Sequence, residues 1–429
     1  MSRKSILQQI LIVLARATIR RYQPVVIGVT GSVGKTSTRE AIACVLAKKY
    51  RTRQPEKNFN NEIGLPLTIL GIPHSGKNIF KWLWWLKVAF WRAYMWRAKY
   101  PEVLILEYGI DHPGDMDVLL GIARPKIGVV TAIGMMPVHV EFFAAPAAVA
   151  EEKAKLISTL PVDGTAILNA DDEIVSMMRE KTKAHVMLFG KNSNANVRVG
   201  EYTIDLMNEG ERRGMPQGIS FQLTAAGVAT PVHVRGVFGE PQMYAVAAAI
   251  TVGLAMGISL EESVSAIRSY IPPAGRMRLL EGIQNTLILD DTYNAAPEAM
   301  RAALATLAAL PARRKIAILG DMLELGEFAE EAHRAIGRLA GAFVDVLIAV
   351  GSCSKIIADE ARTAGKEVYV FSDAASAVHE ILSYIRPGDL ILVKGSQGMR
   401  MERIVEKLLA HPEKAKNLLV RQDDYWKSH

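Results

Sequence analysis

The residues most capable of chemistry form a glycine loop. Residues 30–36 read TGSVGKT and lie between an apolar, β-branched segment at 25–30 and a helical pattern. Glycines allow backbone N–H groups to close around phosphate oxygens, and the start of the following helix favours negative charge. Lys35 would neutralise the β and γ phosphates of a nucleotide, and Thr36 would hold Mg²⁺. The residues expected to surround the phosphates are Gly31, Ser32, Val33, Gly34, Lys35, Thr36 and Ser37.

The elements around this loop predict a parallel α/β sheet. A strand pattern, the glycine loop and a helical pattern follow one another at 25–50, as at the start of such a sheet. Apolar runs at 103–109, 127–133 and 164–170 have the composition of buried parallel strands. Between about 185 and 238, short alternating segments with glycine-rich turns indicate a β-rich flap. The expected fold is therefore an α/β P-loop domain with a mostly parallel sheet and a flap.

A second α/β domain is expected after a short linker. Residues 271–275 contain paired prolines and a glycine, which stop helices and strands. Strand and helix patterns then alternate, which predicts a Rossmann-like, doubly wound sheet. The sequence therefore divides into a helix at 1–24, a central domain at 25–270, the linker and a C-terminal domain at 276–429.

Composition narrows the class of protein. The 429 residues are 50% apolar and 22% charged, which excludes disorder and fits well-buried α/β domains. A formal charge of +7 favours anionic ligands, such as nucleotides, phosphorylated substrates or an anionic membrane surface. No basic run is interleaved with aromatics in a recognisable reader module, so nucleic acid is not expected as a partner. Cys44 and Cys353 are too few and too far apart for a zinc site or disulfide framework, which favours a reducing cytoplasm.

Two basic, apolar segments lie outside these patterns. Residues 1–24 predict an amphipathic helix that ends before Pro24, and they lack the cleavage pattern of a signal peptide. Residues 77–100 hold five of the six tryptophans together with lysines and arginines. A spanning helix is disfavoured because Lys87 and Arg92 would lie near the bilayer centre. Both segments would either pack on their own domain or lie in a membrane interface, where tryptophan and cationic side chains are favoured.

The glycine loop and several later motifs resemble those of the Mur ligase family. The pattern TGSxGKT begins with threonine, and Val29 replaces the first glycine of the commoner phosphate-binding loop. The match extends in order and spacing from residue 25 to about residue 410. It resembles most closely the branch that adds D-alanyl-D-alanine (D-Ala-D-Ala) to a muropeptide in peptidoglycan synthesis. The further motifs are EKNFNNEIGLP (56–66), LEYG (106–109), PGDM (113–116), His139, EKAK (152–155), LNADD (168–172), Gly275-Arg276, DDTYNAAP (290–297), LGDMLELG (319–326) and KGS (394–396).

The resemblance implies an ATP-dependent ligase that joins a carboxylate to an amine. ATP would convert the carboxylate into an acyl phosphate, which the amine then attacks. The family pattern also implies a second Mg²⁺ near Glu107 and His139, and a carbamate on Lys153 that supplies an anionic oxygen. Taken singly, these residues would be a solvated glutamate, a satisfied histidine and an exposed helix lysine. The implied catalytic residues are Lys35, Glu107, His139 and Lys153, the implied metal ligands are Thr36, Glu107, His139 and Lys153, and the implied ATP contacts of the last domain are Arg276, Asp291, Tyr293 and Asn294.

Three departures from the family pattern leave alternatives open. Members of this branch usually carry a uridine-nucleotide-binding domain before the glycine loop, so UDP contacts are expected to be missing here. A GxHNxxN pattern usually helps to seat adenine, whereas residues 239–245 read GEPQMYA, with Pro241, Gln242 and Ala245 at the histidine and the two asparagines. Ala296 replaces a further asparagine. The alternatives are a ligase for a non-UDP or membrane-presented substrate, and a nucleotide-binding scaffold without ligase activity. The leading expectation is a monomeric cytoplasmic enzyme, with peripheral contact at the inner face of the membrane left open.

Overall fold

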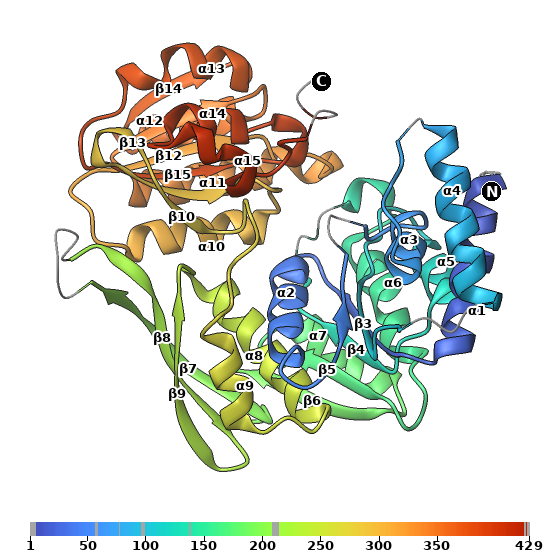
Figure 1. Cartoon of the computed structure of the whole chain (residues 1–429). Coiled ribbons are helices and arrows are strands. Elements are labelled where there is room, and N and C mark those ends of the chain that lie inside the picture. The colour runs from blue at the N-terminus through green and yellow to red at the C-terminus, as the bar shows by residue number, and fades with distance from the viewer. Residues whose placement is uncertain are drawn as a thin grey trace.

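Two sheets, each covered by helices, organise the residues that the structure describes (Figure 1). The structure is a computed structural model, and it describes residues 6–55, 59–76, 78–95, 99–135, 137, 139–207, 214–423 and 426. The start of the EKNFNNEIGLP motif, Glu56 to Asn58, lies outside these residues. The predicted fold class, a P-loop α/β domain followed by a second α/β domain, is confirmed.

The first sheet contains nine strands in the order β2-β3-β1-β4-β5-β6-β7-β8-β9, counted over the described residues. Neighbours from β2 through β7 run parallel, whereas β8 pairs antiparallel with both β7 and β9. The β-rich flap therefore extends the parallel sheet at one edge. The strands are β1 (Val25–Thr30), β2 (Thr52–Arg53), β3 (Val103–Glu107), β4 (Ile127–Val130), β5 (Thr165–Asn169), β6 (His185–Gly190), β7 (Val197–Leu206), β8 (Pro216–Ala225) and β9 (Val228–Arg235).

Helices bury both faces of this sheet because its central strands are apolar on both sides. Successive side chains of a strand point to opposite faces. Ile27 and Val29 pack in a cluster with α2, α8 and α9, whereas Val26 packs in a cluster with α1, α3 and α5. The helices are α1 (Ile6–Tyr22), α2 (Lys35–Leu46), α3 (Gly64–Leu70), α4 (Ile79–Phe90), α5 (Asp115–Ile122), α6 (Pro146–Ser158), α7 (Glu173–Met177), α8 (Glu240–Ala255) and α9 (Leu260–Ile267).

The second sheet has the order β10-β11-β15-β12-β13-β14 among the described residues. Its strands are parallel except β10, a short edge strand that pairs antiparallel with β11 and that the sequence patterns did not predict. The strands are β10 (Arg278–Glu281), β11 (Leu287–Asp291), β12 (Lys315–Gly320), β13 (Val346–Val350), β14 (Glu367–Phe371) and β15 (Leu390–Lys394). The helices are α10 (Pro297–Ala309), α11 (Ala329–Phe343), α12 (Ser354–Thr363), α13 (Ala374–Glu380), α14 (Glu402–Leu408) and α15 (Ala415–Leu418).

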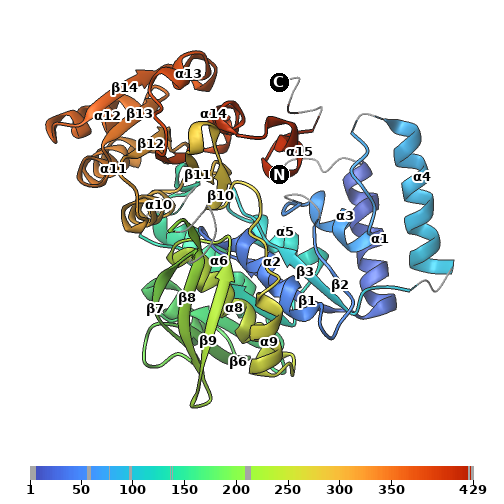
Figure 2. The same ribbon diagram turned by 60° about the vertical axis from the view of Figure 1, so that its left-hand side comes forward.

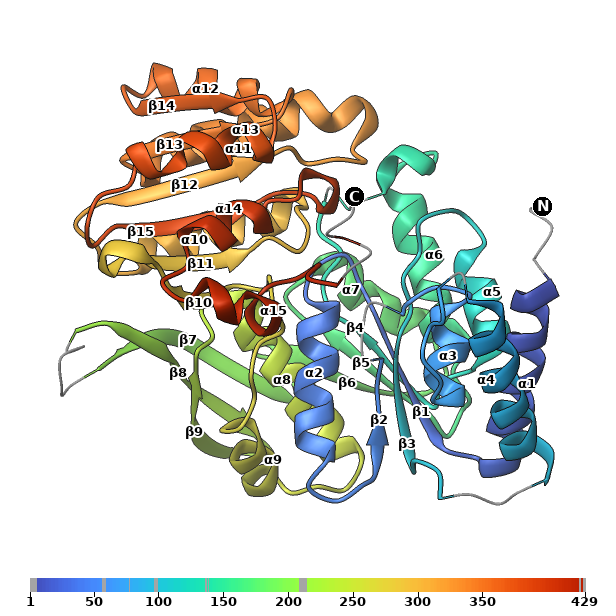
Figure 3. The ribbon, with the colours of Figure 1, turned by 45° about the horizontal axis from the view of Figure 1, so that its top comes forward.

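The C-terminal sheet lies beside the start of α2, away from α1 and α4 (Figure 3). The segment 271–275, expected as a linker, lies between α9 and β10. The Arg276 side chain that follows it reaches the hydroxyl of Thr36 at the start of α2. The fold thereby brings the glycine loop and the first residues of the C-terminal sheet together.

Helices α1 and α4 form an outer layer on the far side of the central domain (Figure 2). Helix α1 ends at Tyr22, two residues before Pro24, as the amphipathic pattern predicted. The tryptophan-rich segment forms α4 and then a π-helical turn at Trp91–Met95. Lys77, Trp96 and Arg97 of that segment lie outside the described residues. None of the helices in the described part of the chain is long and apolar enough to cross a membrane.

Candidate active site

The glycine loop joins β1 to α2 and is held against the end of β4. The backbone of Gly31 (φ 143°) and of Gly34 (φ 88°) lies in the left-handed region that favours glycine. A Cβ atom on Gly31 would overlap the Thr131 hydroxyl. That hydroxyl donates to the Val33 carbonyl (2.6 Å), and the Ser32 N–H donates to the Ala132 carbonyl (2.6 Å). The loop is therefore preorganised for close approach of an anion before any ligand binds.

Lys35 already lies at the mouth of this loop. Its Nζ donates to the Gly31 carbonyl at 2.8 Å. Burial lowers the pKa of Lys35, while the nearby Glu107 carboxylate acts in the opposite direction. The arrangement places one cation where phosphate oxygens would enter the loop.

Thr36, Glu107 and Arg276 converge beside the loop from three different elements. The Thr36 hydroxyl donates to Glu107 Oε2 at the end of β3, and Arg276 Nη2 donates to the same hydroxyl, each at 3.2 Å. Glu107 is 3% exposed, so its charge acts in a largely water-free setting. The sequence patterns predicted all three residues near the nucleotide, and the fold brings them into contact.

Lys153 is buried in α6 close to the same charges. Its exposed fraction is 1%. Burial lowers its pKa well below the usual value, and Lys35 adds to this, whereas Asp111, Glu107 and Glu152 oppose it. Lys153 is thus a buried amine within electrostatic reach of the phosphate loop, rather than the exposed helix lysine that composition alone suggests.

His139 connects the two domains. Its backbone is left-handed (φ 66°), which turns the ring between Asp111 and Glu324. Nδ1 lies 2.7 Å from Glu324 Oε2 in the C-terminal domain, and Nε2 lies 3.4 Å from Asp111 Oδ1. The close contact with His139 lowers the pKa of Glu324. In this conformation His139 therefore contacts the LGDMLELG motif, and Nε2 is the ring atom turned to the central domain.

The DDTYNAAP loop is fixed by the KGS motif. Lys394 Nζ contacts Asp291 Oδ2 at 2.6 Å and donates to the Asn294 carbonyl at 2.8 Å. The other oxygen of Asp291 accepts from the Met277 N–H at 3.1 Å, so Asp291 is engaged within its own domain. The Tyr293 ring stacks under the Arg276 guanidinium, 3.8 Å from the ring centroid. This stacking holds Arg276 toward Thr36.

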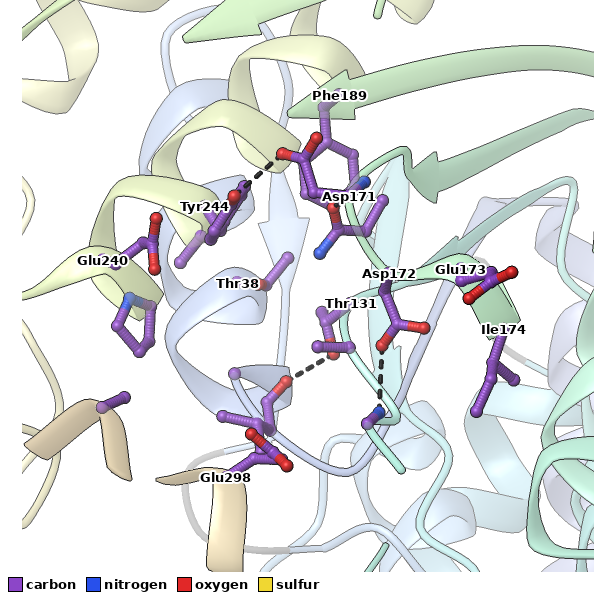
Figure 4. Close-up of a pocket in the computed structure, with 18 of the residues that line it drawn as sticks. Thr38, Thr131, Asp171, Asp172, Glu173, Ile174, Phe189, Glu240, Tyr244 and Glu298 are labelled. Atoms are coloured by element: carbon purple, nitrogen blue, oxygen red, sulfur yellow. Dashed lines mark hydrogen bonds between the residues drawn. The ribbon is translucent and has the colours of Figure 1, made fainter. Parts of the chain in front are cut away.

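A cavity of about 450 Å³ adjoins the glycine loop (Figure 4). Val33 and Gly34 line it on the loop side, and carboxylates gather around the rest. Tyr244 donates to Asp171 at 2.8 Å, which fixes one wall. Its other polar or charged lining residues include Asn169, Asp172, Glu173, Glu240 and Glu298, and Pro241 and Ala245 contribute apolar surface.

Gln242 occupies the family's other asparagine position and turns away from this cavity. Its amide donates to the Arg276 carbonyl at 2.9 Å and lies 3.4 Å from the Ser37 hydroxyl. Its carbonyl oxygen accepts from the Tyr270 hydroxyl at 3.0 Å. Gln242 therefore links the phosphate loop to the start of the C-terminal domain.

Arg39 is a charged residue at this site that the sequence patterns did not single out. It lies in α2 with 3% of its surface exposed, and its Nη1 is 3.6 Å from Glu107 Oε2. Its Nε and Nη1 atoms have no hydrogen-bond partner among the described residues. Nothing in its local pattern distinguishes a buried arginine from a solvated one on a helix. Asp111 and Glu324 were missed likewise, because only the fold brings them to His139.

A phosphate-binding loop whose threonine contacts an arginine of a second α/β domain defines a nucleotide-dependent, two-domain enzyme. The sequence pattern of the Mur ligase middle domain matches residues 29–80 and 92–253, and that of the Mur ligase glutamate ligase domain matches residues 275–397. The chain belongs to the Mur ligase family. It is therefore an ATP-dependent ligase that forms amide bonds, as the motifs predicted.

Named relatives cover most of the chain. It is 32% identical over 409 residues to the UDP-N-acetylmuramoyl-tripeptide–D-alanyl-D-alanine ligase of Mycobacterium tuberculosis (strain CDC 1551), covering 90% of this chain and 73% of that protein. It is 28% identical to the Bacillus subtilis enzyme of the same name, covering 93% and 79%. The crystal structure of MurF from Acinetobacter baumannii matches with a TM-score of 0.76 at 26% identity, covering 93% and 79%. A MurF ligase from Thermotoga maritima in complex with ADP shares the fold, with a TM-score of 0.73 at 24% identity and coverage of 97% and 86%.

Removing Glu324 should weaken the contact between the domains. We expect Glu324→Ala to raise the KM for ATP about fivefold, because a partly exposed ion pair contributes about 1 kcal/mol. Steady-state kinetics with varied ATP measure this change. Glu327→Ala alters an exposed carboxylate of the same segment and should leave the KM unchanged. Equal KM values for both variants would show that the His139 contact has no part in closing the site.

Proposed function

We propose that the chain joins D-Ala-D-Ala to the free carboxylate of a muropeptide precursor in peptidoglycan synthesis. The observation that carries the proposal is the 3.2 Å contact from Arg276 to Thr36, because it brings a cation of the C-terminal domain to the phosphate loop. The substrate pair is taken from the relatives named UDP-N-acetylmuramoyl-tripeptide–D-alanyl-D-alanine ligase, which align with 90% or more of this chain. Residues 271–275 would act as the hinge when the domains close over ATP.

The proposed reaction balances as ATP, carboxylate and amine giving amide, ADP and phosphate. A carboxylate oxygen attacks the γ phosphorus, and the bond from that phosphorus to the β-phosphate oxygen breaks. The amine nitrogen then attacks the acyl carbon, phosphate leaves with the carboxylate oxygen, and the nitrogen loses a proton. Lys35 and Arg276 would neutralise the charge that develops on the phosphoryl oxygens.

Oxygen atoms suited to Mg²⁺ converge beside the loop. Thr36 Oγ1 and Glu107 Oε2 lie 3.2 Å apart, and hard cations prefer such oxygen ligands. We propose that Thr36 holds one Mg²⁺ and Glu107 a second, with a carbamate on buried Lys153 as a further oxygen ligand. His139 would contribute through Nε2, since Nδ1 is engaged with Glu324. When bound, the ions would neutralise phosphate charge.

The cavity beside the loop would take the adenine of ATP. Its carboxylates suit the exocyclic amino group of adenine, which is a hydrogen-bond donor. This composition differs from the histidine and asparagine of the family pattern and offers another means of holding the base. Asp291, Tyr293 and Asn294 would frame the nucleotide from the C-terminal side.

Filling this cavity tests the assignment. Ala302 of α10 lines it and is partly exposed, so Ala302→Trp should occupy the space without overpacking the core. We expect the Kd for ADP, measured by calorimetry, to rise about tenfold or more, since losing about 1.4 kcal/mol of apolar contact with the base raises a Kd tenfold. Ala305→Trp, on an exposed position of the same helix, is the control. An unchanged Kd in Ala302→Trp would place the base elsewhere.

A phosphate-release screen tests the proposed function. Candidate carboxylates, including UDP-muramoyl tripeptide, are crossed with amines, including D-Ala-D-Ala, at fixed ATP. The proposal expects phosphate release and a new amide for that pair, and little release when either partner is omitted. Turnover with a different pair, and none with this one, would keep the ligase class and overturn the substrate.

Two alternatives have specific support. The apolar surface of α4 favours a non-UDP acceptor presented at a membrane, and vesicle-embedded acceptors in the same screen would reveal it. Pro241, Ala245 and Ala296 favour a nucleotide-binding scaffold, which amine-dependent ADP release would exclude.

We further propose that the protein is a cytoplasmic monomer that does not bind nucleic acid. Size-exclusion chromatography with light scattering tests whether the protein is a monomer.

A further inference from the structure

We propose that α4 and the following turn, residues 79–95, dock this protein on an anionic lipid surface. The outward face of α4 carries large apolar side chains that do not pack in the core of the domain. Phe80 is 85% exposed, Leu83 60% and Trp84 62%, at the spacing of one helical stripe. The stripe continues over Trp91 at 48% exposed and Met95 at 62%. Only Trp82 and Ala89 of the twelve α4 residues are buried.

The surface is held rigidly even though its apolar side chains face outward. Asn78 caps α4 by accepting from the Lys81 N–H at 2.9 Å, and the Trp82 indole donates to the Gly76 carbonyl at 3.0 Å. Arg21 of α1 donates to the Tyr94 carbonyl at 2.9 Å. These contacts fix one face of the segment to the domain. The exposed stripe is therefore held in a fixed position on the surface of the domain.

Charge identifies the partner. Residues 79–95 contain Lys81, Lys87 and Arg92 and no acidic residue, and residues 6–22 of the neighbouring α1 contain three arginines and no acidic residue. Lys81 and Lys87 are exposed and form no ion pair among the described residues. A cationic, tryptophan-rich and apolar stripe matches the interface of a bilayer with anionic headgroups. A soluble acidic protein would pair with the lysines but would not account for the exposed aromatic rings, which a bilayer interface favours.

The segment also lies largely outside the shared sequence pattern of the family. The middle-domain pattern of the family matches up to residue 80 and resumes at residue 92, so it omits most of α4. Figures 1 and 2 both place α4 on the side of the central domain away from the C-terminal sheet. A bilayer against α4 would therefore leave the C-terminal domain free to open and close. The proposal is independent of the ligase assignment.

Vesicle co-sedimentation of the full chain tests it. Wild-type protein should bind vesicles of mixed phosphatidylglycerol and phosphatidylcholine, and bind weakly to phosphatidylcholine alone. Lys81→Gln with Lys87→Gln should weaken binding by about 25-fold, since each surface lysine contributes roughly fivefold. Added salt should weaken wild-type binding in the same direction. The triple variant Phe80→Gln, Leu83→Gln, Trp84→Gln should weaken it by about tenfold or more.

Controls keep the outcome decisive. Val162→Gln with Val228→Gln removes two other exposed apolar side chains, 73% and 57% exposed, and should bind vesicles like wild type. All variants should melt at the wild-type temperature because every substituted side chain is exposed. Absence of binding to anionic vesicles, or equal binding by the triple variant, would overturn the proposal. A dimer that the triple variant dissociates, without vesicle binding by the wild type, would assign the surface to a second copy and equally overturn it.

Discussion

Lys35→Ala is expected to reduce turnover about a thousandfold, with folding unchanged. Lys35 Nζ lies 2.8 Å from the Gly31 carbonyl, at the mouth of the loop. Removing one preorganised charge from a site of phosphoryl transfer typically lowers kcat by about 10²- to 10³-fold. In the variant, Lys35 no longer positions the phosphates relative to Lys153 and Arg276. Phosphate release at saturating ATP and acceptor measures the effect.

Lys48→Ala provides the matched control for this experiment. Lys48 is exposed just beyond the end of the same helix, so its loss changes the net charge equally and leaves the loop intact. The control should turn over at the wild-type rate. Turnover by Lys35→Ala within threefold of the control would mean that the glycine loop does not bind the reacting phosphates.

Lys153→Met is expected to lower turnover at least about a hundredfold while leaving stability equal or higher. The side chain is 1% exposed, and a methionine of similar length avoids the free-energy cost of taking an amine out of water. A purely structural lysine would give the opposite pattern, with lower stability and retained activity. Thermal melting and phosphate release, measured on the same preparations, separate these outcomes.

The carbamate itself has a direct readout. Wild-type protein in ¹³C-labelled bicarbonate should show a carbamate carbonyl resonance, and its activity should fall reversibly when CO₂ is removed. Lys155→Met, two residues along α6 at a partly exposed lysine that pairs with Asp117, should keep both the resonance and the activity. Full activity in CO₂-free buffer, with no labelled signal, would contradict carbamylation of Lys153.

The fold was largely predictable because its strands carry strong local patterns. Central strands such as β1 and β12 are apolar on both faces, and the glycine loop marks where β1 turns into α2. The features of the fold that were not predicted have weak sequence patterns. β10 has four residues at a sheet edge, and the alternation of β7 to β9 indicated a flap without indicating that it continues the sheet.

The candidate site was predictable only where the family resemblance implied a role for both partners of a contact. Thr36, Glu107 and Arg276 all belong to motifs, and the fold brings them together. His139 and Glu324 also lie in family motifs, but the resemblance implies no role for the Glu324 side chain, so their contact was not predicted. Arg39 was not predicted as a site residue because its burial depends on the packing of α2 against the sheet.

The fate of one oxygen atom tests the central claim most directly. A substrate carboxylate labelled with ¹⁸O at both oxygens is incubated with ATP, the amine and the protein, and the released phosphate is analysed by mass spectrometry. Activation of the carboxylate by ATP at the loop predicts that each phosphate carries one labelled oxygen and that ADP and amide form in equal amounts. Unlabelled phosphate accompanying amide formation would contradict it, because the carboxylate would not have accepted the phosphoryl group.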